Sequence, residues 1–279
     1  VRTMPIKELL VIADNDASCR SRLDITFGLA AEHGARVVGL HVMPPPIMPL
    51  YADVPIPESV EKLQRLELED SARRAATVFA AAAAHTGVPT EWRVVEGDVL
   101  RQAALHARYA DLTLVPQGVD LGSPSANLAP LPEQLVLTVG RPVLVIPRYG
   151  SFPKVGRRVL VAWNGSREAT RAVHDALPLL ERAEQVTVLS IDPTVEPENR
   201  LPGADIALYL ARHGATVQAA SMAGLDMMVG ELVLSYAADH DIDLLVMGAY
   251  GHARLREMVL GGATRSLLQH MTTPVLLSH

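Results

Sequence analysis

The sequence predicts an α/β fold of two tandem domains, each built on a five-stranded parallel sheet with helices on both faces. Short apolar segments alternate with helical segments along the whole chain, which is typical of a parallel sheet with right-handed crossovers. The same order of segments occurs twice, which indicates an internal repeat. The 279 residues, 49% of them hydrophobic, are sufficient for packed cores.

The first half of the chain contains five predicted strands, at 8–13, 36–43, 92–96, 112–115 and 142–146. Helices are predicted from the turn after Ala13 to about His33, from 58 to about 85, from 97 to about 109, and over 132–139. Gly34 is the expected C′ residue of the first helix. Six prolines between 44 and 57 exclude a helix or a central strand there and predict an extended surface loop.

The same order begins again after a predicted linker at 149–156. The segment at 158–166 aligns in sequence with 8–16, and the segment at 273–278 repeats the Pro-Val-Leu pattern of 141–147. We therefore expect one domain at 1–149 and a second at 150–279.

Charge and cysteine content exclude several classes of function. The formal charge is −6 and the pI is about 5.9, so nucleic acid and membranes are not expected partners, and only a local basic patch stays open. Cys19 is the one cysteine, which excludes an internal disulfide and favours a reducing compartment. No signal peptide is recognised, and the alanine-rich run at 75–84 is too short to span a bilayer. We expect a soluble, cytoplasmic protein.

A glycine-rich turn follows the apolar strand expected at 243–247. Gly248 and Gly251 stand where such a strand leaves the sheet, which is where open α/β sheets bind ligands. Glycines there allow positive φ angles and a close approach of backbone N–H groups to a phosphate. Such glycines also occur as simple turns, so the wider pattern decides the interpretation.

A second glycine pair completes that pattern. Gly261, Gly262, Ala263 and Thr264 precede an amphipathic helix, whose unpaired N–H groups and dipole can receive a phosphate. Arg265 follows directly, and among the nearby cations it is the one favoured to contact phosphate.

These residues resemble the universal stress protein superfamily, whose nucleotide-binding members carry Gly, two residues, Gly, nine residues, Gly and then Ser or Thr. Gly248, Gly251 and Gly261 match that spacing, and Gly262 stands in place of the Ser or Thr. The resemblance implies Rossmann-like domains, similar to adenine nucleotide alpha hydrolases, with strand order 3-2-1-4-5. It further implies that the two domains pair through their fifth strands, and it leaves open whether two chains associate into a homodimer.

The resemblance also assigns the segment Ala162, Trp163 and Asn164 to the adenosine end of the second crevice. Family members usually have Asp at the position of Asn164. Asn164 itself is interpreted either as a contact to the ligand or as a residue that starts the following helix. The ring of Trp163 either stacks on a base or fills its place. In the first half Asp14 is present, but Pro116 replaces the first glycine, so that half resembles a site that has lost nucleotide binding.

Three hypotheses remain open at this point. In the first, the second domain binds an adenine nucleotide, ATP foremost, as a sensor, and the need for Mg²⁺ is left open. In the second, both crevices are closed and the protein acts through interactions with partners. In the third, a different small ligand binds near Tyr51 in the proline-rich loop. No catalytic or metal-binding motif is recognised, so catalysis is not expected beyond a weak ATPase.

Overall fold

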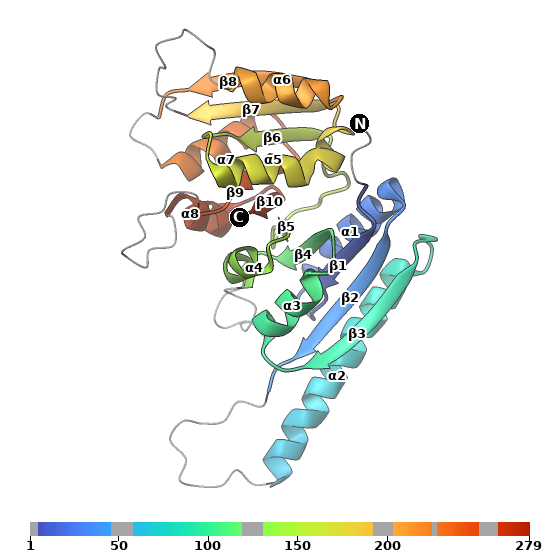
Figure 1. Cartoon of the computed structure of the whole chain (residues 1–279). Coiled ribbons are helices and arrows are strands. Elements are labelled where there is room, and N and C mark those ends of the chain that lie inside the picture. The colour runs from blue at the N-terminus through green and yellow to red at the C-terminus, as the bar shows by residue number, and fades with distance from the viewer. Residues whose placement is uncertain (1–4, 46–57, 119–130, 192–202, 225–227, 251–261) are drawn as a thin grey trace.

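The computed structural model describes residues 5–45, 58–118, 131–191, 203–224, 228–250 and 262–279 (Figure 1). One order of strands and helices occurs twice, in a first half from β1 to β5 and a second half from β6 to β10. The first half consists of β1 (Glu8–Ile12), α1 (Cys19–His33), β2 (Arg36–Met43), α2 (Glu58–Ala83), β3 (Thr90–Glu96), α3 (Val99–Ala107), β4 (Leu112–Pro116), α4 (Leu131–Val139) and β5 (Val143–Ile146).

The second half repeats this arrangement, with a shorter second helix of 9 residues against the 26 of α2. It consists of β6 (Arg158–Ala162), α5 (Arg167–Leu180), β7 (Gln185–Ile191), α6 (Ala204–Arg212), β8 (Val217–Met222), α7 (Val229–Asp239), β9 (Leu244–Gly248), α8 (Gly262–His270) and β10 (Val275–Ser278). The repeat read from the sequence is therefore present in the fold. Boundaries shift slightly: β3 begins at Thr90 because its backbone pairs with Val37 at the start of β2.

One sheet runs through both halves, in the order β3-β2-β1-β4-β5-β10-β9-β6-β7-β8 (Figure 1). Within each half the paired strands are parallel and follow the order 3-2-1-4-5, as the family resemblance implied. The fifth strands β5 and β10 pair antiparallel, with Val145 opposite Val275 and Val143 opposite Leu277. The expected pairing of the two domains through these strands is confirmed.

Helices cover both faces of this sheet. Apolar residues of α1, α2, α5 and α6 pack on one face, and those of α3, α4, α7 and α8 pack on the other. At the junction of the halves, Leu144 and Leu276 face the first layer, whereas Val145 and Val275 face the second, because side chains alternate along a strand. Both cores thus continue across the β5–β10 contact.

An aspartate fixes the start of the central strand in each half. The carboxylate of Asp111 accepts the amide hydrogens of Lys7 and Glu8, at 2.7 and 3.0 Å. Asp243 accepts those of Gly156 and Arg157, at 2.9 and 3.0 Å, in the equivalent place. Each carboxylate satisfies backbone donors at the strand entrance that have no ladder partner there. The repeat therefore extends to individual hydrogen bonds.

Helix α2 is longer than the layer it covers. Its buried residues are Ala72, Ala75 and Phe79, all in the C-terminal half of the helix. Val60, Leu63 and Leu66 in the N-terminal half are exposed, and Figure 1 shows this part projecting past the ends of β2 and β3. Only the second half of α2 is therefore held by the core.

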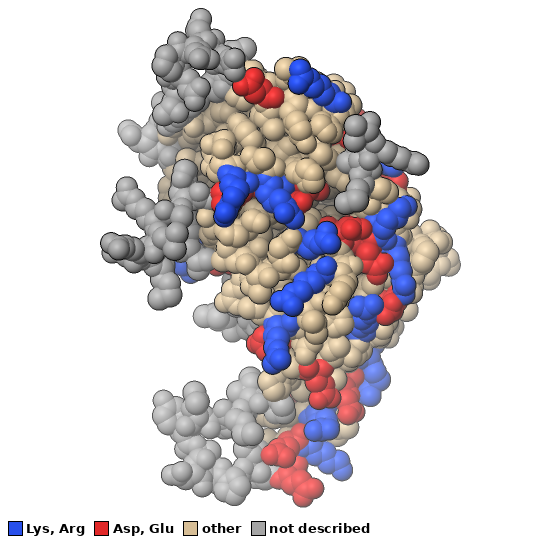
Figure 2. All heavy atoms as spheres, in the orientation of Figure 1, with Lys and Arg blue, Asp and Glu red and all other residues tan. Residues whose placement is uncertain are grey.

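Charged side chains are unevenly spread over the face shown in Figure 2. Lys and Arg side chains form a row that crosses α5 and α3, while both signs are interleaved along α2. Arg171 of α5 donates to the carbonyl of Gly140, so this helix contacts the other half of the chain. Among the described residues, no helix has the length and apolarity needed to cross a membrane.

Candidate functional site

The sheet order defines a crevice in the second half. Strand β6 lies between β7 and β9. From β6 the chain passes into α5 on one face of the sheet, and from β9 it passes into α8 on the opposite face. The carboxyl ends of β6 and β9 therefore lie side by side at a switch point, paired up to Ala162 and Met247. Ligands of open α/β sheets bind at such a point.

The segment predicted to face a nucleoside begins at the end of β6. Ala162 is the last residue of that strand and is half-buried, and Trp163 follows it. The Trp163 amide donates to the carbonyl of Leu189 in β7, at 2.8 Å. Its ring packs against the apolar layer of α5 and α6, next to Gly203. Trp163 is thus directed to the face of the sheet opposite α8.

Asn164 is exposed and forms the turn into α5. Its Oδ1 accepts the amide hydrogen of Ser166, at 3.1 Å, and Ser166 Oγ in turn accepts that of Ala169 as the N-cap of α5. This confirms the helix-start role considered for Asn164. The side-chain amide Nδ2 of Asn164 makes no hydrogen bond to the described part of the chain, so it retains a free donor at the mouth of the crevice.

Gly248 ends β9, and the structure gives a different reason for this glycine than the sequence did. A Cβ at this position would lie 2.4 Å from the Ala169 nitrogen and 2.5 Å from the Glu168 carbonyl carbon. The expectation of a positive φ at Gly248 is wrong; the positive φ, 60°, belongs to Tyr250. Gly248 is required because the first turn of α5 packs directly on the strand end.

The phosphate end of the predicted site is described only in part. Gly251 and Gly261 lie outside the described residues. Helix α8 begins at Gly262, three residues earlier than the sequence predicts, so Gly262, Ala263 and Thr264 belong to its first turn rather than precede it. Thr264 is buried and Arg265 is exposed. Helix α8 is the next described element after β9, so the N-terminus of α8 is linked to the carboxyl end of β9 by connectivity.

Two residues beside the crevice were missed by the sequence analysis. Glu168 is buried next to Gly248; burial opposes its ionisation, but hydrogen bonds from its own amide and from Arg167, with the nearby His279, hold its pKa below the usual range. The hydroxyl of Tyr250 is buried and has no hydrogen-bond partner among the described residues. Burial raises the pKa of Tyr250, and the neighbouring carboxylate of Glu133 in α4 adds to the effect.

The equivalent place in the first half is filled by a buried ion pair. Asp14, at the position of Asn164, lies 2.9 Å from the guanidinium of Arg22, which is fully buried and also donates to the carbonyl of Ile12 at 2.9 Å. In the second half Asn164 and Ala172 stand at the two corresponding positions. The first half therefore holds a salt bridge where the second carries a neutral, exposed amide.

The turn after β4 also has a structural role in the first half. Pro116 ends the strand, and the side chain of Gln117 donates to the carbonyls of Leu268 and Gln269 at the C-terminus of α8, at 2.8 and 3.1 Å. Its Oε1 accepts the amide hydrogen of Arg148. The turn after β4 corresponds to the turn that carries the glycine motif in the second half. In the first half this turn instead connects the two halves of the chain by hydrogen bonds.

The described residues offer no cluster of three or more His, Cys, Asp or Glu side chains able to hold a metal ion. Tyr51, around which a different ligand was considered, lies outside the described residues.

Fold and site together define a class: a tandem α/β protein with a topological switch point in each half, one of which carries a buried ion pair. The sequence model of the Universal stress protein family matches this chain twice, at residues 5–147 and 156–279. The chain belongs to the universal stress protein family.

Individual relatives agree with this assignment. A universal stress protein from Synechocystis sp. is 30% identical over 152 residues, which are 52% of this chain and 49% of that relative, so the match spans about half of each. A universal stress protein from Archaeoglobus fulgidus has a similar structure, with a TM-score of 0.72 over 97% of this chain and 95% of that one at 15% identity. A functionally unknown protein from Pseudomonas aeruginosa follows, with a TM-score of 0.57 over 98% and 92% at 15% identity. These similarities show the two-domain fold.

Proposed function

We propose that the protein is a stress-response regulator that binds an adenine nucleotide, ATP foremost, in the crevice of its second half. The observation that carries this proposal is the pairing of β6 with β9 at the switch point, which sets Asn164 beside the start of the glycine motif at Gly248. Nucleotide binding would stabilise one arrangement of the loop after β9, which is a sensor role.

The nucleoside end of this site is supported by Asn164 and Trp163. The free Nδ2 of Asn164 is a donor for an acceptor atom of the base or ribose. Trp163 packs toward α5 and α6, on the face opposite α8, which leaves the α8 side of the strand ends free of its ring. This direction favours an open crevice over one filled by Trp163.

The phosphate end is supported by the sequence motif and by α8. Gly251, Gly261 and Gly262 supply the glycines of the motif, and the N-terminus of α8, with Thr264 and Arg265 in its first turn, offers donors and positive potential to phosphate oxygens. Mg²⁺ would be held mainly by the phosphates of the nucleotide. Arg265, exposed on α8, would add a charge-assisted contact.

A separate observation favours a second candidate function, that of an interaction protein that binds no nucleotide. Glu168, whose carboxyl pKa is held below its usual range, packs against Gly248 through its Cβ and carbonyl carbon, so its negative charge opposes phosphate near the strand end. In the first half the corresponding position carries Asp14, paired with the buried Arg22. A protein with two closed crevices would act through contacts with other proteins. The experiment below separates the two.

The test begins with the protein as purified, without added nucleotide. Denaturation followed by anion-exchange chromatography of the supernatant detects any co-purified nucleotide, and calorimetry then follows titration with ATP, with and without Mg²⁺. We expect saturable binding that Gly251→Val abolishes and that Thr264→Val weakens, whereas Thr272→Val, on an exposed threonine beyond α8, leaves it unchanged.

Absence of both released nucleotide and heat at millimolar ATP would reject nucleotide binding and favour the interaction protein. A thermal melt of each variant checks that the fold is retained. Asn164→Asp provides a further readout, because Asp keeps the turn to Ser166, as Asp14 does to Asp16 in the first half, while it adds the acceptor charge usual in the family. We expect it to raise the affinity for ATP with Mg²⁺.

A further inference from the structure

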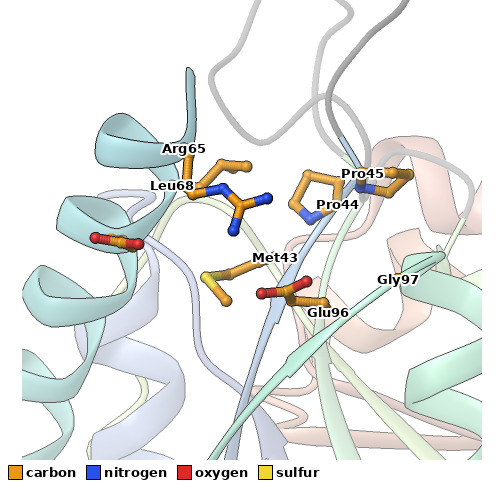
Figure 3. A pocket seen from close by; sticks show the side chains of 8 residues that line it. Met43, Pro44, Pro45, Arg65, Leu68, Glu96 and Gly97 are labelled. Carbon is orange, nitrogen blue, oxygen red and sulfur yellow. The ribbon is translucent and has the colours of Figure 1, made fainter. Parts of the chain in front are cut away.

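A cavity of about 260 Å³ opens at the far end of the first half, away from the glycine motif (Figure 3). It lies at the carboxyl ends of β2 and β3, beneath the projecting part of α2. The side chains that matter for its chemistry are Met43, Pro44, Leu68, Arg65, Glu69 and Glu96, all within the described part of the chain. Its size is below the roughly 300–1,000 Å³ of pockets that hold drug-sized ligands, so it fits a small metabolite.

One side of this cavity is apolar. Met43 ends β2 and is half-buried, Pro44 follows it, and Leu68 faces them from α2. The unbranched thioether of a methionine adapts to apolar groups of different shape. Apolar atoms make up most of the surface that the cavity presents, so a ligand needs an apolar part to gain from binding.

Charged groups of both signs stand around the apolar part. In Figure 3 the guanidinium of Arg65 points down toward Met43, and the carboxylate of Glu96 lies beside Met43 and points toward the same space. Glu69 adds a second carboxylate one turn along α2 from Arg65. None of these three side chains forms an ion pair with another described residue, although Arg73 and Arg74 on the same helix both pair with Asp70.

We propose that this cavity binds a free α-amino acid with an apolar side chain. Arg65 would pair with the α-carboxylate through its planar fork of N–H donors, and Glu96 with the α-ammonium. The side chain of the ligand would lie against Met43, Pro44 and Leu68. A zwitterion places its two charges on one carbon and its apolar group on the same carbon, which matches the three-part lining of the cavity.

Other ligand classes fit the lining less well. A phosphate ester would meet two carboxylates and one guanidinium, a net negative surrounding. A plain amine would bring a positive charge next to Arg65 and give Arg65 no partner. A plain carboxylate would bring a negative charge next to Glu96 and Glu69 and give these two side chains no partner. The presence of both signs next to an apolar wall is the feature that selects a zwitterion.

The test is calorimetric titration of the full chain with leucine and with methionine. Alanine lacks the apolar side chain, 4-methylpentanoate lacks the ammonium, and isoamylamine lacks the carboxylate. We expect saturable binding of leucine or methionine, with each of the three partial ligands weaker by roughly tenfold or more. Arg65→Met and Glu96→Gln should each weaken binding by a similar factor, because both positions are exposed and tolerate the change without unfolding.

Matched control variants lie on the same helix outside the cavity. Arg73→Met and Glu67→Gln remove the same charges and should leave leucine binding unchanged. Gly251→Val should leave it unchanged as well, so this result is independent of nucleotide binding. The proposal is overturned if leucine and methionine give no saturable heat at 10-millimolar scale, if isoamylamine or 4-methylpentanoate binds as well as leucine, or if Arg65→Met binds leucine like the wild type.

Discussion

The guanidinium of Arg22 lies 2.9 Å from the carboxylate of Asp14, and Arg22 is fully buried. Arg22→Met leaves a buried, unpaired carboxylate, so we expect the free energy of unfolding to fall by about 3–5 kcal/mol. The double variant Asp14→Asn with Arg22→Met imitates the neutral second half and should be less destabilised than the single one. Urea denaturation of all four members of this cycle measures the difference; additive losses would contradict the pairing.

The thiol of Cys19 should be inert in the folded protein. Cys19 is buried at the start of α1, and burial raises the pKa of its thiol, which keeps the reactive thiolate scarce at neutral pH. Labelling with Ellman's reagent at neutral pH should be slow in the native state and fast in urea. Rapid native labelling would show that the start of α1 opens readily.

His33 should make stability depend on pH. Burial lowers its pKa below the ordinary value of about 6.5, and the positive charge of Arg182 lowers it further. The unfolded chain binds a proton at His33 more readily than the folded chain does. The contribution of His33 to the free energy of unfolding is therefore fully present above pH 6.5 and is lost as the pH falls below that value. We expect His33→Gln to reduce the difference between urea midpoints at about pH 7.5 and 5.5. The pKa of His106 is lowered as well, so part of the dependence should remain in this variant.

Gly248 and Gly28 form a matched pair for alanine substitution. A Cβ at Gly248 meets the backbone of α5 at 2.4 Å, whereas one at Gly28, in the middle of α1, meets nothing within 4 Å. Gly248→Ala should therefore cost about 1–3 kcal/mol of stability. Gly28→Ala should instead raise stability by roughly 0.5–1 kcal/mol, because alanine loses less backbone entropy in a helix. Thermal or urea unfolding distinguishes the two signs; equal effects would reject the packing argument.

Most strands and helices could be predicted from the sequence because each of them has a local sequence pattern. Buried parallel strands read as short unbroken apolar runs, and Gly34 marks the end of α1 with a left-handed φ of 61°. The strand order 3-2-1-4-5 followed from the family resemblance, since periodicity alone does not encode which strands are neighbours. The antiparallel β5–β10 contact was expected for the same reason.

The site was harder to predict because contacts between distant residues decide it. The motif spacing identified Gly248, but its close contact with Ala169 depends on how α5 crosses β9, which is a tertiary property. Arg22 carries no motif, and a signal existed only in the comparison of the two repeats, where Arg22 corresponds to Ala172. The three charges around the cavity come from α2 and β3, segments that no local pattern joins.

The antiparallel contact of β5 with β10 has a consequence for assembly. Both fifth strands are covered within one chain, so the association of the two halves is an intramolecular reaction whose effective concentration is set by the short connection between Ile146 and Arg158. Dilution cannot separate them, and the unfolding of this junction should not depend on protein concentration. In the part of the chain that the structure describes, β3 and β8 are the outermost strands of the continuous sheet, so a further chain would add a strand at one of these two ends.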